Sequence, residues 1–231
     1  MIQLAIDLTP RPALGRTDFL RSDCNAAALD WIDRWPDWPA PAVALYGPSG
    51  SGKTHLAHLW CAHAGADLIA AEAVAEIDPA RLFGAGPRGV AIDEAERAAE
   101  APLLHLYNSC VENGGSLLII AREPPATWPI ALADLASRLR ALPTVGIAAP
   151  DDGLIAAVLV KHFADRQLRV APEIIAYLLP RMERSFAAAT ALAARLDQLA
   201  LSRGGAVTIP LARQVLAEER DQSSASDFAV T

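Results

Sequence analysis

Residues 47–54 read Gly-Pro-Ser-Gly-Ser-Gly-Lys-Thr, which is a complete G-x-x-x-x-G-K-T pattern. Glycines at these positions let the backbone wrap around a phosphate, and the N–H groups of the loop and the following helix supply positive field. The lysine, Lys53, reaches the outer phosphates in such a loop, and the hydroxyl of Thr54 holds Mg²⁺. The residues that we expect to contact the nucleotide are Gly47, Pro48, Ser49, Gly50, Ser51, Gly52, Lys53, Thr54 and His55.

The flanking residues decide between a phosphate-binding loop and a chance surface turn rich in glycine and serine. An apolar run, residues 43–46, precedes the pattern. Residues 55–63 contain no glycine or proline, and their apolar side chains recur at helical intervals. A strand before and a helix after are the context that a phosphate-binding loop requires. The sequence therefore predicts a nucleotide-binding protein.

A second polar group follows another apolar strand, residues 89–94, which ends in Asp93 and Glu94. If this strand is parallel to the one before the loop, Asp93 lies near the magnesium and Glu94 near an attacking water. The alternative is a solvated acidic start of a helix, where an Asp-Glu pair is common. The phosphate-binding loop upstream favours the functional interpretation.

Short apolar strands alternate with helical segments over the first part of the chain. The predicted strands are residues 43–46, 68–71, 89–94, 116–121 and 144–147. The predicted helical segments are residues 25–34, 55–63, 72–83, 103–112 and 132–142. This alternation predicts an α/β fold, in which a parallel sheet is covered by helices on both faces.

The pattern changes after Ala149-Pro150. Four further helical segments are predicted at residues 154–167, 173–181, 185–203 and 211–219, with no strand among them. They predict a small all-α lid domain. We expect four parts: an N-terminal segment 1–15, a nucleotide-binding domain 16–150, a helical domain 151–220 and a mobile polar tail 221–231.

The composition narrows the function further. The 231 residues carry a formal net charge of -7, which argues against a general nucleic-acid binder. Cys24, Cys61 and Cys110 are widely spaced and match no metal or redox pattern, as expected in a reducing cytoplasm. No apolar run approaches the ~18 residues of a membrane span, and the first residues do not read as a signal peptide. We expect a cytoplasmic protein with no membrane association.

Two stretches ahead of the first strand are ambiguous. Residues 2–8 alternate apolar and polar side chains, which suits an edge strand, a frayed terminus or a short linear motif that docks in a partner's groove. Phe19, Leu20 and Asn25 are candidates to cover the nucleotide base, although a Phe-Leu pair is more often plain core.

The chain as a whole resembles the AAA+ ATPases and, more closely, the Hda family of proteins homologous to the replication initiator DnaA. The likeness covers residues 17–218. The segments that carry it are Asp18-Phe19-Leu20 with Asn25, residues 47–56, residues 104–108, Pro124-Pro125 and Ser137-Arg138-Leu139. The resemblance implies an AAA+ domain followed by a helical lid, in a protein that binds ADP or ATP with Mg²⁺.

The resemblance also implies partners and a reaction. Gln3, Leu4, Ile6 and Leu8 resemble the motif through which Hda binds the DNA polymerase sliding clamp. Arg138 stands at the arginine-finger position, which implies that the protein promotes hydrolysis of DnaA-bound ATP and so restrains replication. The chain ends after the lid, where DnaA continues into a helix-turn-helix domain, so we expect no DNA-binding domain of that kind. An exposed arginine on a charged helix face is the alternative for Arg138.

The sequence departs from the family at its two sensor positions. Ala121-Arg122 stands where DnaA has a polar or acidic sensor residue, and Ala187 stands where the lid carries the second sensor arginine. Arg181, Arg184 or Arg195 could replace that arginine. Losing both sensors predicts a weak ATPase, although Glu94 remains the expected catalytic carboxylate.

Other functions stay open at this point. A helicase-loader-like ATPase that hydrolyses its own ATP is compatible with the intact loop and carboxylates. A scaffold in which bound ADP only stabilises the fold is a third interpretation. The sequence also leaves open whether ADP or ATP is the working ligand and whether the chain forms a homo-oligomer.

Overall fold

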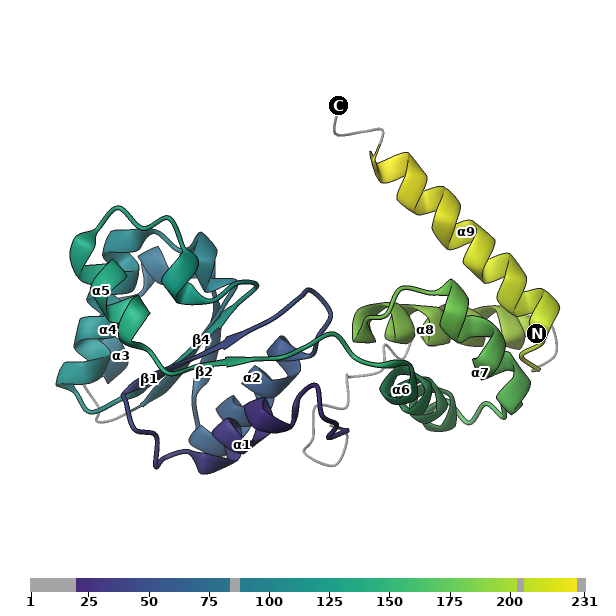
Figure 1. Cartoon of the computed structure of the whole chain (residues 1–231), viewed down its shortest axis with the longest axis horizontal. Coiled ribbons are helices and arrows are strands. Elements are labelled where there is room, and N and C mark those ends of the chain that lie inside the picture. Colours follow the sequence, from purple (N-terminus) through teal and green to yellow (C-terminus); the bar gives the residue numbers. More distant parts are fainter. Residues whose placement is uncertain (1–19, 84–87, 203–205, 228–231) are drawn as a thin grey trace, which may run out of the picture.

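The computed structural model describes residues 20–83, 88–202 and 206–227. They form two parts, an α/β domain and a helical lid, which are joined by the segment after the last strand (Figure 1). The N-terminal motif Gln3, Leu4, Ile6 and Leu8 and the candidate Phe19 lie outside the described residues.

Within the described residues the α/β domain contains one sheet of five parallel strands in the order β2-β3-β4-β1-β5. The strands are β1 Ala42–Tyr46, β2 Asp67–Ala70, β3 Gly89–Asp93, β4 Ser116–Ala121 and β5 Thr144–Gly146. Side chains of β1, β3 and β4 are buried on both faces of the sheet, which explains their continuous apolar runs. The parallel sheet that the alternating pattern predicted is therefore confirmed.

Helices cover both faces of this sheet (Figure 1). α1 Ala26–Arg34 and α2 Lys53–Ala64 pack on one face, where Leu29 and Trp60 are fully buried. The helices α3 Pro79–Phe83, α4 Glu100–Glu112 and α5 Ala133–Ala141 cover the other face. In the described part of the domain there are also three short 3-10 helices: η2 Ala71–Glu76, η3 Ala95–Arg97 and η4 Pro125–Thr127.

The lid has its own apolar core. Its helices are α6 Asp152–Asp165, α7 Pro172–Leu178, η5 Leu179–Arg181, α8 Phe186–Ser202 and α9 Ile209–Asp227. Leu159, Phe163, Leu192 and Val215 are buried between them. Asp151 caps α6, because its carboxylate accepts a hydrogen bond of 2.7 Å from Leu154 N. The first helix of the lid therefore begins directly after Asp151.

A few boundaries differ from the expectation. The connector expected as one helix over residues 72–83 is two short helices, η2 and α3, separated at Ile77 and Asp78. The last helix, α9, continues to Asp227 and so includes part of the segment expected as a polar tail. No helix in the described residues is both long and apolar enough to cross a membrane. Cys61 and Cys110 are buried in the apolar layers, which raises the pKa of Cys61 to about 11 and that of Cys110 to about 12.

The buried end of β3 provides a test of the fold. Ile92 is completely buried beside Asp93, so Ile92→Ala should lower the free energy of unfolding by about 2–5 kcal/mol through lost contacts and a cavity. Leu201 is 70% exposed, and Leu201→Ala should change stability by less than about 0.5 kcal/mol. Urea denaturation followed by circular dichroism measures both, and equal effects would contradict the placement of Ile92.

Candidate functional site

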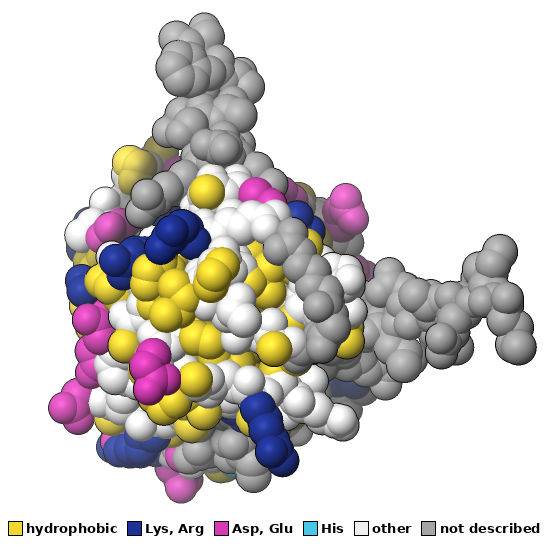
Figure 2. All heavy atoms as spheres, turned by 90° about the vertical axis from the view of Figure 1, so that its right-hand side faces the viewer, with side chains coloured by type: hydrophobic (Ala, Val, Ile, Leu, Met, Phe, Trp, Pro, Cys, Tyr) yellow, Lys and Arg dark blue, Asp and Glu magenta, His cyan; other side chains and the backbone are white. Residues whose placement is uncertain are grey.

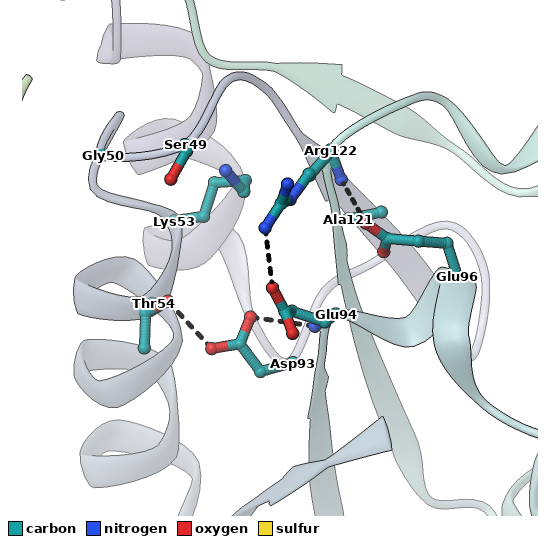
Figure 3. A pocket seen from close by; sticks show the side chains of 9 residues that line it. All are labelled: Ser49, Gly50, Lys53, Thr54, Asp93, Glu94, Glu96, Ala121 and Arg122. Atoms are coloured by element: carbon teal, nitrogen blue, oxygen red, sulfur yellow. Dashed lines mark hydrogen bonds and ion pairs between the residues drawn. The ribbon is translucent and has the colours of Figure 1, made fainter. Parts of the chain in front are cut away.

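A polar pocket lies where the strands β1, β3 and β4 end (Figure 3). Because β4 pairs with both β1 and β3, the segments that follow these three strands meet at one edge of the sheet. The pocket is lined by Ser49, Gly50, Lys53, Thr54, Asp93, Glu94, Glu96, Ala121 and Arg122. The pocket therefore brings together the loop, Lys53, Thr54 and the two carboxylates, Asp93 and Glu94, that the sequence predicted.

The glycines of the loop are required by its backbone. Gly50 and Gly52 have φ of 69° and 93°, in the left-handed region that glycine adopts without strain. A Cβ at Gly47 would lie 2.3 Å from the carbonyl oxygen of Ile147, and one at Gly50 would lie 2.6 Å from the Cβ of Ser185. The loop leads directly into α2, which begins at Lys53. Its first N–H groups thus face the pocket region, as phosphate binding at a helix N-terminus requires.

Lys53 is held over the loop by backbone groups. Its ammonium donates hydrogen bonds of 2.7 Å to the carbonyl oxygens of Gly47 and of Pro48. Burial lowers the pKa of Lys53, and the carboxylates of Asp93 and Glu96 oppose that shift. The ammonium of Lys53 is therefore a hydrogen-bond donor held at the wall of the pocket. A bound phosphate would accept hydrogen bonds from it, in place of the two carbonyl oxygens or together with them.

Thr54 and Asp93 form the part of the pocket that suits a divalent cation. The Thr54 hydroxyl donates a hydrogen bond of 2.9 Å to Asp93 Oδ2, while Glu94 N donates to Asp93 Oδ1 at 3.0 Å. Hydroxyl and carboxylate oxygens are ligands that Mg²⁺ accepts. The described residues contain no cluster of three or more histidine, cysteine or carboxylate side chains arranged for a metal. Mg²⁺ here would therefore take its remaining ligands from phosphate and water.

Glu94 is held between two arginines. Its backbone is left-handed, with φ of 49°, and its carboxylate accepts bonds from Arg97 and Arg122. These hydrogen bonds, that from Arg97 foremost, hold the pKa of Glu94 below its usual value. The sequence placed Glu94 beside an attacking water, but it did not indicate that two cations bind the carboxylate.

Arg122 and Glu96 are pocket residues that the sequence analysis did not assign. Arg122 was noted only as a departure at a sensor position, yet its guanidinium points into the pocket toward Glu94 (Figure 3). Glu96 Oε1 accepts a hydrogen bond of 3.1 Å from Arg122 N. The sequence did contain a signal for Arg122. It directly follows the buried strand β4, just as Asp93 ends the buried strand β3, and residues at such strand ends meet at one edge of a parallel sheet.

Several predicted residues do not line the pocket. Asn25 is buried, but its amide holds the turn before α1, donating to Leu20 O and accepting from Ser22 N. Leu20 is half-buried beside this turn. Five other residues predicted to contact the nucleotide flank the lining residues in the loop and at the start of α2 without lining the pocket themselves: Gly47, Pro48, Ser51, Gly52 and His55.

Three lid arginines were expected as replacements for the second sensor, and none of them lines the pocket formed by the described residues: Arg181, Arg184 and Arg195. Arg184 pairs with Asp152, Arg195 pairs with Glu218, and Arg181 donates to Tyr177 O and stacks on its ring. The lid instead meets the loop through its backbone, because Phe186 N donates a hydrogen bond of 2.9 Å to Gly50 O. In this arrangement none of Arg181, Arg184 and Arg195 reaches the pocket, as a second sensor arginine would.

Arg138 lies on α5, outside the pocket lining. Its guanidinium pairs with Asp134 at 3.1 Å and lies over the ring of Tyr107, 5.5 Å from the ring centroid. The start of α5 is tied to α4, because the Glu100 carboxylate accepts hydrogen bonds from Ala131 N and Leu132 N. These contacts fix an arginine that does not face the chain's own pocket.

The comparisons with known proteins agree with this architecture. The lid domain of Hda matches residues 151–216, so the chain carries an Hda lid domain. No curated protein matches the chain by sequence.

Solved structures are similar at low sequence identity. Domain III of the replication initiation protein DnaA from Thermotoga maritima has a TM-score of 0.77 at 15% identity, covering 90% of this chain and 97% of that one. AMPPCP-bound DnaA from Aquifex aeolicus has a TM-score of 0.72 at 16% identity, covering 91% and 71%. The AAA domain of FIGL-1 in complex with ADP has a TM-score of 0.63 at 16% identity, covering 90% and 88%. These likenesses show an AAA+ fold.

Lys53 gives a direct test of the pocket. Lys53→Ala removes an ammonium that would bind phosphate oxygens, so the affinity for ATP and for ADP should fall at least about 30-fold. Lys161→Ala, which removes a lysine of α6 that pairs with Asp165 and does not line the pocket, should leave both affinities unchanged. Isothermal titration with each nucleotide and Mg²⁺ measures the change, and wild-type affinity in Lys53→Ala would rule out this pocket.

Proposed function

We propose that this chain, which carries an Hda lid domain and has an AAA+ fold, is a DnaA-related regulator of DNA replication. In this role it binds ADP or ATP with Mg²⁺ and, together with the DNA-loaded sliding clamp, promotes hydrolysis of ATP on DnaA. It thereby restrains initiation and acts in the cytoplasm. The observation that carries the proposal is an arginine, Arg138, held by Asp134 and Tyr107 outside the pocket that Lys53, Thr54 and Asp93 line.

Adenine nucleotide binding is supported by the pocket and by its relatives. Lys53, Thr54 and Asp93 provide the ammonium, hydroxyl and carboxylate that a nucleotide phosphate with Mg²⁺ requires. The similar DnaA from Aquifex aeolicus is bound to AMPPCP, and the FIGL-1 domain is bound to ADP.

Arg138 is the residue proposed to act on DnaA. A guanidinium supplied by a neighbouring subunit stabilises charge that develops on the transferred phosphoryl group, an effect on the order of 10³-fold or more. Asp134 and Tyr107 hold Arg138 in place, which limits the conformational entropy that it would lose at a partner's site. Because Arg138 does not line the chain's own pocket, action on a second AAA+ subunit is favoured, whether DnaA or a further copy of this chain.

The sliding clamp is the proposed tether. Gln3, Leu4, Ile6 and Leu8 would occupy an apolar groove on the clamp as an extended peptide, with the apolar side chains as anchors. Tethering raises the effective concentration of the regulator near newly replicated DNA.

A helicase-loader-like ATPase is the second candidate. The pocket brings together Lys53, Thr54, Asp93 and Glu94, which are the parts that phosphoryl transfer requires. On that function the purified chain would hydrolyse ATP briskly, single-stranded DNA would raise the rate, and Glu94→Gln would abolish it.

The clamp dependence is tested with the DnaA of the same organism. We expect the hydrolysis of DnaA-bound ATP to rise when this chain and clamp loaded on DNA are both present, and to stay at the basal rate when the clamp is omitted. Gln3→Ala together with Leu8→Ala should abolish the stimulation, because the motif would no longer bind the groove. A rate unaffected by the chain under either condition would remove the proposed function.

Arg138 is tested in the same assay with a control from its own helix. Arg138→Ala should return the DnaA-bound ATP hydrolysis to the unstimulated rate, because the transition-state cation is lost. Its own affinity for nucleotide should be unchanged, since Arg138 does not line the pocket. Arg140→Ala removes an exposed charge two positions along α5 and should retain stimulation. Full stimulation by Arg138→Ala would rule out the role.

A further inference from the structure

Two arginines from different parts of the chain bind the same carboxylate at the pocket. Arg97 Nη1 lies 2.6 Å from Glu94 Oε2, and Arg122 Nη2 lies 3.1 Å from Glu94 Oε1. Each oxygen of Glu94 therefore has its own guanidinium. Arg97 comes from η3, one turn after Glu94. Arg122 follows β4, the strand that pairs with β3, and Figure 3 shows its guanidinium directed at Glu94.

Both arginines are themselves anchored. Arg97 Nη2 lies 3.0 Å from Glu72 Oε1 on η2, and Arg122 N donates to Glu96 Oε1 at 3.1 Å. Opposite charges thus alternate from Glu72 through Arg97 and Glu94 to Arg122, while Glu96 holds the backbone amide of Arg122. The left-handed backbone at Glu94, with φ of 49°, sets the carboxylate between its partners. A non-glycine residue adopts this conformation only where surrounding contacts hold it.

We propose that Arg97 and Arg122 form a clamp that restrains Glu94 and slows hydrolysis of ATP in the chain's own pocket. This inference depends on the nucleotide binding in the proposed function, but not on DnaA or the sliding clamp. In the restrained step, a water oxygen forms a bond to the terminal phosphorus and the bond to the bridging oxygen breaks. ADP leaves, inorganic phosphate forms, and Glu94 takes the proton of the water. Glu94 must turn an oxygen toward that water, and each guanidinium opposes the turn.

The exposure of the three side chains limits the size of the effect. Glu94 is 38% exposed, and the arginines are 60% and 62% exposed, so water screens both pairs. Exposed pairs of this kind change an equilibrium by up to about fivefold each. The clamp is therefore a modest brake, and releasing one arm should raise the rate about two- to fivefold.

The two arms serve different experimental purposes. Arg122 lines the pocket beside Lys53, so its removal can also weaken the binding of phosphate. Arg97 does not line the pocket, and its guanidinium pairs with Glu94 and Glu72. Arg97 variants therefore report on the restraint of Glu94 without removing a pocket cation.

The test is single-turnover hydrolysis of ATP by the full-length chain with Mg²⁺, after the ATP affinity of each variant has been measured. Arg97→Ala should raise the rate about two- to fivefold at unchanged affinity. Arg97→Lys, which retains the charge, should return the rate toward wild type. Arg97→Ala combined with Arg122→Ala should be faster still at saturating ATP. The control Arg213→Ala removes an arginine of α9 and should have the wild-type rate.

Glu94→Gln separates the clamp from a general loosening of the fold. The increase in Arg97→Ala should disappear when Glu94→Gln is added, because the released carboxylate is the group that acts. An increase that persists in that double variant would overturn the clamp, as would an Arg97→Ala rate at or below wild type with normal ATP affinity. If the wild-type chain binds no ATP, the proposed function falls together with the clamp.

Discussion

The parallel pairing of β4 with β1 on one side and β3 on the other is the constraint on which the site depends. Because these strands run in one direction, the residues that follow them emerge together at one edge of the sheet. Tyr46 stands opposite Ala121 in this register, which places the phosphate-binding loop beside Arg122. Ile92 stands opposite Ile119, and Asp93 therefore enters the same pocket. The buried apolar side chains of the three strands stabilise this register.

The charges in the pocket balance one another within the chain. Lys53 and Arg122 face Asp93, Glu94 and Glu96, and the ammonium of Lys53 also binds two loop carbonyls. A bound phosphate would add negative charge beside the two cations, while Mg²⁺ at Thr54 and Asp93 would offset part of it. The polar groups of the pocket thus bind one another within the chain. A nucleotide with its metal can take the place of these internal partners.

Different forces position the pocket and Arg138. Strand ends and loop backbone set the pocket. Arg138 depends instead on its ion pair with Asp134 of the same helix and on the ring of Tyr107, while the Glu100 carboxylate holds the residues just before α5. The lid meets the loop through one backbone hydrogen bond, from Phe186 N to Gly50 O. Gly50 permits that approach because a side chain there would collide with Ser185. The lid contact therefore does not depend on the charged side chains of the lid.

The sequence by itself determined the parallel α/β domain, the helical lid and the joint position of Lys53, Thr54 and Asp93. These follow from local patterns: alternating apolar segments, a loop of fixed spacing and a strand that ends in carboxylates. Only the tertiary structure decided the partners of the long charged side chains. Arg97 and Glu72 are distant in sequence, as are Arg122 and Glu94, and no local pattern links them. Likewise, Arg184 pairs with Asp152, 32 residues away, because a long side chain takes the partner that folding places nearest.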